Sequence, residues 1–312
     1  MNILVTGCAG FIGSHLCESL LTSGNSVLGI DSFTQNYAKD QKIKNLVNLI
    51  NHHNFYFYSI DFSDIEYYSK FDFDVVIHLA AHPGVRPSLL YPEKYVDNNV
   101  AKFVRLLEFA RKLKNIKRFI FASSSSVYGN NDVPFSESAE PNPISIYGAT
   151  KLAGESLCRT YHNIYGLPIT CLRFFTCYGP RQRPDLAIRL FSEKIFRGEP
   201  ITVLGNGGTS RDYTYIADTV AGINKAIVDD STGFNIYNLG NNQPVGLLEL
   251  INILFAAIGK KTDLVHEAMQ LGDVNHTWAD TSKATRILNW KPQVDLTTGV
   301  SLFISWLRDQ QC

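Results

Sequence analysis

The chain has 312 residues, of which 45% are hydrophobic and 19% charged, and its 29 basic residues balance 29 acidic ones. This composition is typical of a globular protein with a sizeable core, built as one large α/β unit or as about two domains. A net charge of zero argues against nucleic acid or an anionic membrane as a partner, because no positive field would attract either. An anionic ligand would therefore have to be held by local basic residues.

Targeting and metal-binding signals are missing from the sequence. Six scattered cysteines, at positions 8, 17, 158, 171, 177 and 312, lack the spacing of a disulfide framework or of zinc ligands, so we predict free thiols and no metal. Met1 leads directly into an apolar run without a basic signal segment. No apolar stretch reaches the roughly 18 residues that span a membrane. We therefore expect a cytoplasmic protein with no membrane partner.

Short strands and helices alternate through the first half of the chain. We predict strands at 3–5, 26–30, 55–59, 75–78 and 119–122, and helices near 11–23, 38–51, 64–69 and 93–114. This alternation predicts an α/β fold of Rossmann type, in which helices cover both faces of a doubly wound parallel sheet.

The second half has a looser rhythm, with frequent proline and glycine after about residue 178. Helices are predicted near 185–197, 246–258, 281–288 and 297–309. The predicted organisation is a dinucleotide-binding domain over 1–178, joined by part of 209–240, and a smaller α/β lobe over 179–312 that mainly binds substrate. The ligand cleft is expected between them.

Three glycines follow the first predicted strand, in the sequence Gly7-Cys-Ala-Gly10-Phe11-Ile12-Gly13. Without Cβ atoms the chain can turn tightly, and its backbone N–H groups can approach a pyrophosphate at the start of the next helix. Strand-to-helix turns also use glycine for steric reasons alone, so the motif needs support from other residues.

That support comes from acidic residues after the next two strands. Asp31 ends the second predicted strand, where a carboxylate accepts both ribose hydroxyls of NAD and repels the 2′-phosphate of NADP. Asp61 and Phe62 follow the third strand and are placed to meet the adenine ring, although Asp61 is equally suited to capping a helix. The sequence therefore predicts NAD as the cofactor.

Tyr147 and Lys151 begin a predicted helix, and their i,i+4 spacing places them on one face. An ammonium group near a phenol favours the phenolate, so we expect a lowered pKa at Tyr147 and a role as general base on a sugar hydroxyl. A surface Tyr/Lys pair on an amphipathic helix is the alternative interpretation when the pair is considered alone.

A run of four serines, 123–126, follows the fifth predicted strand at the edge of the sheet where such folds bind ligands. A serine there can share the hydrogen bond of the reacting hydroxyl with Tyr147. Loop solvation and helix capping are the ordinary roles of such serines, and all four cannot be catalytic.

The segments GCAGFIG, HLAA at 78–81, SSSSVYG and YGATK, together with Asp31, resemble the extended short-chain dehydrogenase/reductase family over nearly the whole chain. The resemblance implies that Ser124 completes a triad with Tyr147 and Lys151, and that Ala80 and Asn99 lie at the cofactor. It also implies a homodimer, because relatives pair through helices that correspond to those near 93–114 and 147–165.

The positions after Ser124 distinguish between reactions known in this family. Sugar-nucleotide 4,6-dehydratases carry Asp-Glu there, and UDP-glucuronate decarboxylases place a glutamate at the position of Ser126. This chain has Ser125 and Ser126 and so lacks both carboxylates. A 4-epimerisation needs no further acid, and the resemblance therefore implies transient oxidation at C4 with tightly bound NAD.

Two segments, GVRPSLLYPEKYVDNNV and RFFTCYGPRQRPDLA, resemble UDP-glucuronate 4-epimerases, as does MQLGDVNHTWADTSKA near the end. In those enzymes residues matching Ser125, Ser126 and Thr176 surround the sugar carboxylate, and an arginine matching Arg183 lies near the substrate. UDP-glucose 4-epimerases generally have asparagine at the position of Thr176.

The same resemblance assigns the nucleotide end of the substrate. Arg211 matches an arginine at the diphosphate, Asp273 matches a residue near the nucleotide ribose, and Arg86 is a further candidate. Arg181 departs from the tryptophan commonest in the family. Conversion of UDP-glucuronate to UDP-galacturonate is the expected reaction. The alternatives are UDP-glucose or UDP-N-acetylglucosamine 4-epimerase, decarboxylase or dehydratase, and a dinucleotide-binding protein without catalysis.

Overall fold

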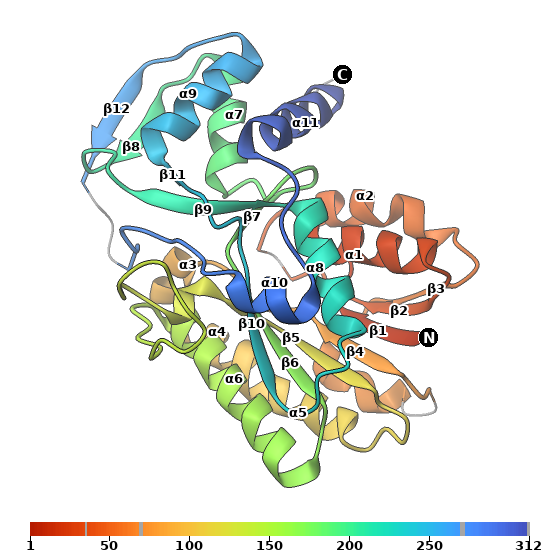
Figure 1. Cartoon of the computed structure of the whole chain (residues 1–312). Helices are drawn as coiled ribbons and strands as arrows, with labels where there is room; N and C mark the ends of the chain where they lie inside the picture. Colours follow the sequence, from red (N-terminus) through yellow and green to blue (C-terminus); the bar gives the residue numbers. More distant parts are fainter. Residues whose placement is uncertain (35, 69–70, 269–271, 311–312) are drawn as a thin grey trace.

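A computed structural model describes residues 1–34, 36–68, 71–268 and 272–310 (Figure 1). Its central sheet contains β1 (Asn2–Thr6), β2 (Ser26–Ile30), β3 (Phe55–Tyr58), β4 (Val75–His78), β5 (Arg118–Ser124), β6 (Ile169–Phe174) and β10 (Asn235–Leu239). The strand order is β10-β6-β5-β4-β1-β2-β3, and all neighbouring strands are parallel. The predicted α/β class is confirmed.

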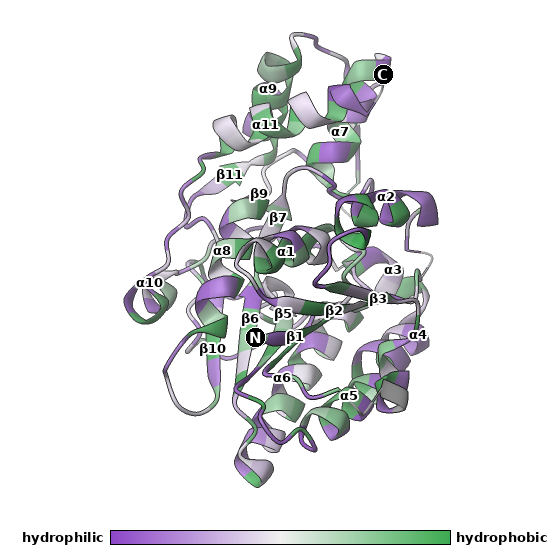
Figure 2. Cartoon of the chain, turned by 90° about the vertical axis from the view of Figure 1, so that its right-hand side faces the viewer, coloured by the Kyte–Doolittle hydropathy of each residue, from purple (hydrophilic) through white to green (hydrophobic). Residues whose placement is uncertain are grey.

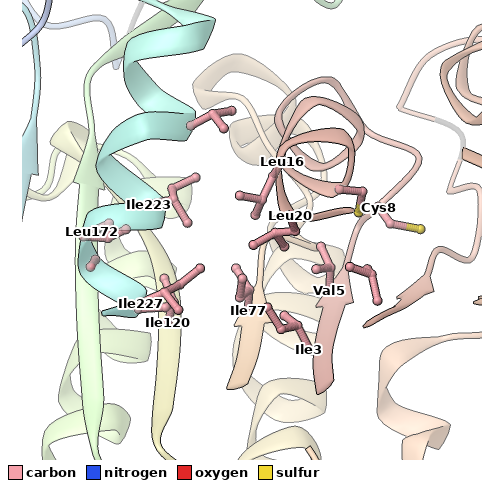
Figure 3. Close-up of a cluster of buried hydrophobic side chains, with 14 of the residues drawn as sticks. Ile3, Val5, Cys8, Leu16, Leu20, Ile77, Ile120, Leu172, Ile223 and Ile227 are labelled. Carbon is pink, nitrogen blue, oxygen red and sulfur yellow. The ribbon is translucent and has the colours of Figure 1, made fainter. Parts of the chain in front are cut away.

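Helices cover both faces of this sheet. The helices α1 (Phe11–Thr22), α2 (Lys39–Ile50) and α8 (Ile216–Ile227) pack on one face, and α5 (Lys102–Ala110) and α6 (Ile146–Tyr165) pack on the other. The strands serve both cores because successive side chains point to opposite faces: Ile3 and Val5 join the first core, and Leu4 joins the second. Figure 3 shows Leu16 and Leu20 of α1 and Ile223 and Ile227 of α8 over the first face.

Local signals set the ends of α6, the helix that carries Tyr147 and Lys151. Ser145 caps its start, because the Ser145 Oγ accepts a hydrogen bond from the Gly148 N–H at 3.1 Å. Gly166 ends the helix in the left-handed conformation, with a φ of 69°. Tyr147 therefore lies in the first turn, at the carboxyl edge of the sheet.

A second group of elements lies above this edge in Figure 1. It contains two small sheets, β11-β9-β7 and β12-β8, formed by β7 (Thr176–Tyr178), β8 (Ile201–Leu204), β9 (Ser210–Tyr215), β11 (Pro244–Gly246) and β12 (Leu264–Glu267). The helices α7 (Ala187–Arg197), α9 (Leu247–Ile258) and α11 (Leu296–Asp309) share a core with β7, β8, β9 and β11, whereas the residues of β12 are exposed. In Figure 2 these helices carry hydrophobic and hydrophilic stretches side by side, as expected for helices that bury one face.

Several predicted elements differ from the structure. The helix predicted at 93–114 is divided into α4 (Pro92–Val96), a π-helical turn η2 (Asp97–Ala101) and α5. The segment predicted as a helix at 64–69 is a 3₁₀ helix, η1 (Phe62–Tyr68), and residue 69 lies outside the described residues. The sequence did not predict α3 (Val85–Leu90) or α8, whereas α10 (Ser282–Leu288) agrees with prediction.

No helix in the described ranges is long and apolar enough to cross a membrane. Those ranges also contain no cluster of three or more His, Cys, Asp or Glu side chains that could hold a metal ion. Five cysteines, at 8, 17, 158, 171 and 177, are buried and free, and Cys312 lies outside the described residues.

Candidate active site

One cavity of about 900 Å³ lies along the carboxyl edge of the sheet and continues under the upper elements. Most of the predicted site residues line it: Gly7, Gly10, Phe11, Ile12, Gly13, Asp31, Phe62, Ala80, Arg86, Ser124, Ser125, Ser126, Tyr147, Lys151, Thr176, Arg183, Arg211 and Asp273. The fold therefore brings together side chains that are far apart in the sequence, as expected for the ligand crevice of an open parallel sheet.

The glycine-rich turn forms one end of the cavity. Gly7 has a φ of +75°, which disfavours a side chain, and a Cβ on Gly13 would lie 2.2 Å from the Gly7 carbonyl oxygen. The chain can therefore pass directly from β1 into α1 only with glycines at these positions. The resulting cradle leaves the first N–H groups of α1 available for a pyrophosphate.

Asp31 lies at the end of β2, beside this turn. Its carboxylate accepts a hydrogen bond from the Phe33 N–H at 2.8 Å and pairs with the Lys42 ammonium at 3.5 Å. Both side chains are almost fully buried in the protein, and both line the cavity. Lys42, which lies on α2, was not predicted as a site residue, because an isolated lysine on an amphipathic helix carries no binding signal.

Tyr147, Lys151 and Ser124 meet where β5 ends. The Lys151 Nζ donates a hydrogen bond to the Ala122 carbonyl at 2.7 Å and lies 5.9 Å from the centre of the Tyr147 ring. The Tyr147 hydroxyl shares a side-chain hydrogen bond with Ser124. The Ser124 Oγ in turn donates to the Ser126 Oγ at 3.1 Å. The predicted triad is therefore gathered around one point of the cavity.

The pKa of Tyr147 differs from the sequence-based expectation. Burial raises it, and this effect outweighs the lowering by the Ser124 hydrogen bond and by the charge of Arg183. The expected lowering by Lys151 is wrong for the polypeptide alone, because the lysine Nζ binds the Ala122 carbonyl rather than the phenol. Burial also lowers the pKa of Lys151 to about 8.

The predicted sugar pocket lies next to the triad. Ser125 and Ser126 occupy a 3₁₀ turn, η3 (Ser125–Val127), directly after β5, and Thr176 is the first residue of β7. All three residues line the cavity. Arg183 is held by Asp185 through two hydrogen bonds of 2.9 and 2.7 Å. Its charge acts on Tyr147, which places the guanidinium at the reacting end of the cavity.

The other predicted substrate residues gather at a different part of the cavity. Arg86 forms an ion pair of 3.0 Å with Asp273. Arg211 donates hydrogen bonds to the carbonyls of Ser210 and Asn275 at 2.9 and 3.1 Å, and burial lowers its pKa. Because Asp273 and Arg86 also act electrostatically on Arg211, the three side chains form one charged cluster.

Two predicted cofactor residues are not among the residues that line the cavity. The Asp61 carboxylate pairs with Lys102 at 2.8 Å. The Asn99 Oδ1 accepts a hydrogen bond from the His82 N–H at 2.8 Å, and its Nδ2 donates to the Thr150 Oγ1 at 3.2 Å. In this structure Asn99 therefore ties the loop after β4 to α6, and any contact with the cofactor stays a prediction.

Arg181, the departure from the family pattern, lies away from the cavity lining. Its Nη2 binds the Glu18 carboxylate of α1 at 2.7 Å, and its backbone has a φ of 66°. Burial of the pair is partial, with side chains 17% and 30% exposed. The departure therefore changes how the loop after β7 is fastened to α1 and adds no charge to the ligand pocket.

The far end of the cavity contains residues that were not predicted. Thr202 and Leu204 of β8, Glu267 of β12 and Lys194 of α7 all line it. No sequence signal marked them, because the core of the upper elements places β8 and α7, and pairing with β8 places β12. They show that the cavity is long enough to continue well beyond the triad.

A parallel doubly wound sheet with a glycine cradle beside an aspartate, and a cavity where Ser124, Tyr147 and Lys151 meet, define the class of dinucleotide-binding α/β proteins. A family profile described as GDP-mannose 4,6 dehydratase matches residues 4–303. The chain belongs to this family. The family is named after one of its reactions, and the residues around the bound sugar decide which reaction a member performs.

Individual relatives are similar over the full length. The UDP-glucuronate 4-epimerase of Thermodesulfobacterium geofontis is 39% identical, with 98% of this chain and 96% of the relative covered. The crystal structure of UDP-glucuronic acid 4-epimerase from Bacillus cereus, in complex with UDP-glucuronic acid and NAD, gives a TM-score of 0.96 at 39% identity and covers 99% of this chain and 100% of that one.

A neutral-sugar enzyme is also similar. The structure of UDP-glucose 4-epimerase from Thermotoga maritima, with UDP-glucose, gives a TM-score of 0.92 at 32% identity and covers 100% of both chains. The fold is therefore shared by epimerases of charged and uncharged sugars. Discrimination between them depends on the side chains around the sugar.

Proposed function

We propose that the protein is an NAD-dependent isomerase that interconverts UDP-glucuronate and UDP-galacturonate by epimerisation at C4. The observation that carries this proposal is the composition of the cavity beside the triad. Hydroxyl groups of Ser125, Ser126 and Thr176 stand there next to Ser124 and Tyr147. This pocket can bind a sugar carboxylate, and its serines occupy the positions where dehydratases and decarboxylases carry carboxylates.

The residues at the ends of β1 and β2 fit a dinucleotide. A side chain on Gly13 would fill the cradle, so the space is available to a pyrophosphate. The buried Asp31 carboxylate is suited to accept hydrogen bonds from ribose hydroxyls. Phe11 and Ile12 line the same region. Asp31 disfavours a 2′-phosphate, although the nearby Lys42 ammonium partly offsets its charge.

The catalytic residues move one proton. When bound, NAD supplies the acceptor and donor of the C4 hydride and a positive charge that favours the Tyr147 phenolate. Tyr147 takes the proton from O4 and later returns it, and Ser124 shares the hydrogen bond of that oxygen. Lys151, fixed on the Ala122 carbonyl, places a positive charge behind the tyrosine ring.

The nucleotide end of the substrate anchors the sugar while its face changes. Arg86, Arg211 and Asp273 bind the diphosphate and ribose, so the sugar can rotate about the diphosphate and present its opposite face. Arg183 and the hydroxyls hold the carboxylate. The segment 179–312 mainly forms this substrate lobe, and 1–178 with part of 209–240 forms the NAD-binding domain.

A product assay tests the reaction and its alternatives together. Purified protein is incubated separately with UDP-glucuronate, UDP-glucose and UDP-N-acetylglucosamine, and the sugars are resolved by NMR. UDP-galacturonate from UDP-glucuronate is the expected product. A pentose or a 4-keto-6-deoxy sugar as the main product, or turnover of the neutral sugars alone, would contradict the proposal.

We also propose that the protein is a homodimer and that it is located in the cytoplasm. Val96 of α4 and Ile164 and Tyr165 of α6 are exposed apolar side chains on the helices implied by the family resemblance. Burying them in a partner would remove apolar surface from water. Sedimentation equilibrium of the purified protein is expected to give twice the chain mass, and a monomer at micromolar concentration would contradict it.

A further inference from the structure

A buried ion pair lies directly behind the catalytic wall of the cavity. Glu155 on α6 accepts two hydrogen bonds from Arg173 on β6, at 2.9 Å from Nε to Oε1 and at 2.7 Å from Nη2 to Oε2. The two side chains are 4% and 2% exposed. Neither residue is among those that line the cavity in the described ranges, so the pair cannot touch the substrate there.

The pair is connected to the site through β5. The Ser123 Oγ donates a hydrogen bond of 2.5 Å to the Glu155 Oε1. Ser123 lies between Ala122, whose carbonyl accepts the Lys151 hydrogen bond, and Ser124. Lys151 and Glu155 are one helical turn apart on α6, and together they fasten the end of β5.

Glu155 is also the charged neighbour of Lys151. The titratable groups around Lys151 are Tyr147, Glu155 and Cys158 on α6, Cys171 on β6 and His78 on β4. Burial lowers the pKa of His78 and raises the pKa of the Cys171 thiol, which favours the uncharged form of both groups. Burial lowers the pKa of Lys151, and Cys158 and then Glu155 act against this lowering; of these two, Glu155 is the one paired with a guanidinium.

Stability alone does not account for this pair. Burying two charges costs solvation, and well-packed apolar residues of similar volume are often as stable. The Arg173 Nη1 is buried without a hydrogen-bond partner, and the guanidinium stacks 4.6 Å from the centre of the Tyr128 ring. Because one donor of the pair has no hydrogen-bond partner, packing alone does not explain why these two residues are charged. Their effect on the neighbouring site can explain it.

We propose that Glu155, held in place by Arg173, is a positioning residue that fixes the strand end carrying Ser124 and supplies a negative charge one helical turn from Lys151. This inference rests on the proposed function, because it assigns the charge of Lys151 a role in that reaction. Glu155 acts through Lys151 and Ser123 and makes no contact with the reacting atoms.

The central experiment removes the charge of Glu155 and keeps its shape. In Glu155→Gln, the pKa of Lys151 is expected to fall by about one unit. The loss of kcat on the alkaline side of the pH profile then begins about one unit lower, and KM for UDP-glucuronate changes less than about twofold. Glu199→Gln is the matched control, because Glu199 forms a similar two-bond pair with Arg197 at the surface.

Lys151 is titrated directly by NMR on protein labelled with ε-¹³C-lysine, with Lys151→Met used to assign its signal. This measurement does not depend on turnover, so it tests the inference even if the wild-type protein fails to form UDP-galacturonate. That failure would instead overturn the proposed function.

A double variant separates positioning from folding. Glu155→Gln leaves Arg173 without its partner and is expected to lower the melting temperature, whereas Glu155→Gln with Arg173→Met removes both charges and recovers much of it. Most of the fall in the pKa of Lys151 is expected to persist in the double variant. The proposal would be overturned if Lys151 titrated in these variants as it does in the wild type. It would also be overturned if kcat fell equally at every pH.

Discussion

At the scale of single residues, the site is shaped by burial as much as by charge. Tyr147 lies half-buried in the cavity wall, and desolvation there raises its pKa. Lys151 is fully buried, which lowers its pKa to about 8. Burial therefore favours the uncharged form of both groups, and in the proposed reaction the positive charge of NAD would have to favour the Tyr147 phenolate.

Tyr147→Phe removes the proposed proton acceptor and leaves the shape of the cavity unchanged. We expect turnover to fall by about 10²–10⁴-fold because general-base catalysis is lost, while bound NAD, measured after denaturation, stays at the wild-type level. Tyr237→Phe serves as a control, since Tyr237 is a buried tyrosine of β10 that bonds Asp229 and does not line the cavity. Near-normal turnover of Tyr147→Phe would contradict the assignment.

Thr176→Val removes one hydroxyl from the proposed carboxylate pocket. The 4-keto form of a uronate is a β-keto acid, so a loosely held carboxylate is lost more readily as CO₂. A hydrogen bond to a charged group contributes about 1.5 kcal/mol, and we expect the ratio of pentose to epimer to rise roughly tenfold.

The control for Thr176→Val is Thr214→Val, on the strand β9 that pairs with β7. The Thr214 hydroxyl is buried without a hydrogen-bond partner and is not among the cavity-lining residues. An unchanged product ratio in Thr176→Val, measured by NMR of the sugars, would argue against the proposed role.

At the scale of elements, the glycine turn and the start of α6 bring the predicted cofactor site and the predicted triad together. The turn between β1 and α1 was recognisable in the sequence because the glycines follow an apolar strand directly. The i,i+4 pair on α6 was recognisable for the same reason, because its two residues are close together in the chain. The division of the predicted helix 93–114 by a π-helical turn was not recognisable, since Asn99 is buried there by hydrogen bonds to the loop after β4 and to α6.

Gly13→Ala tests the close approach of α1 to β1. A Cβ there would lie 2.2 Å from the Gly7 oxygen, so the turn has to open. We expect a loss of about 1–3 kcal/mol in the free energy of unfolding and weaker retention of NAD. Gly246→Ala is the control because nothing lies within 4 Å of its added Cβ. Equal urea-unfolding curves for Gly13→Ala and wild type would contradict this prediction.

At the scale of the whole molecule, buried polar residues join segments that are distant in the sequence. The Asp212 carboxylate of β9 accepts hydrogen bonds from the N–H groups of Asn241, Asn242 and Ala279, at 2.6, 3.0 and 2.9 Å. Asp212 is fully buried, and burial raises its pKa to about 6. It thereby fastens the loop after β10 of the central sheet and the segment at Ala279 to β9, the strand that supplies Arg211.

The raised pKa of Asp212 predicts a contribution to the pH dependence of stability. Between about pH 4 and pH 6 the folded protein holds a proton that the unfolded chain has released, so this group makes the free energy of unfolding fall as pH rises. The full effect is on the order of 2–3 kcal/mol. Urea titrations at stepped pH are expected to give a less negative slope for Asp212→Asn than for wild type, and equal slopes would refute the assignment.

By itself, the sequence determined the α/β class, the glycine turn, Asp31 and the Tyr147–Lys151 pair, because each of these depends on residues close together in the chain. Tertiary structure alone decided which side chains meet. Lys42 reaches Asp31 from a neighbouring helix, Glu155 meets Arg173 and Ser123 across two strands, and Arg181 turns to α1. Such pairings depend on burial and on distances between elements, which spacing along the chain does not encode.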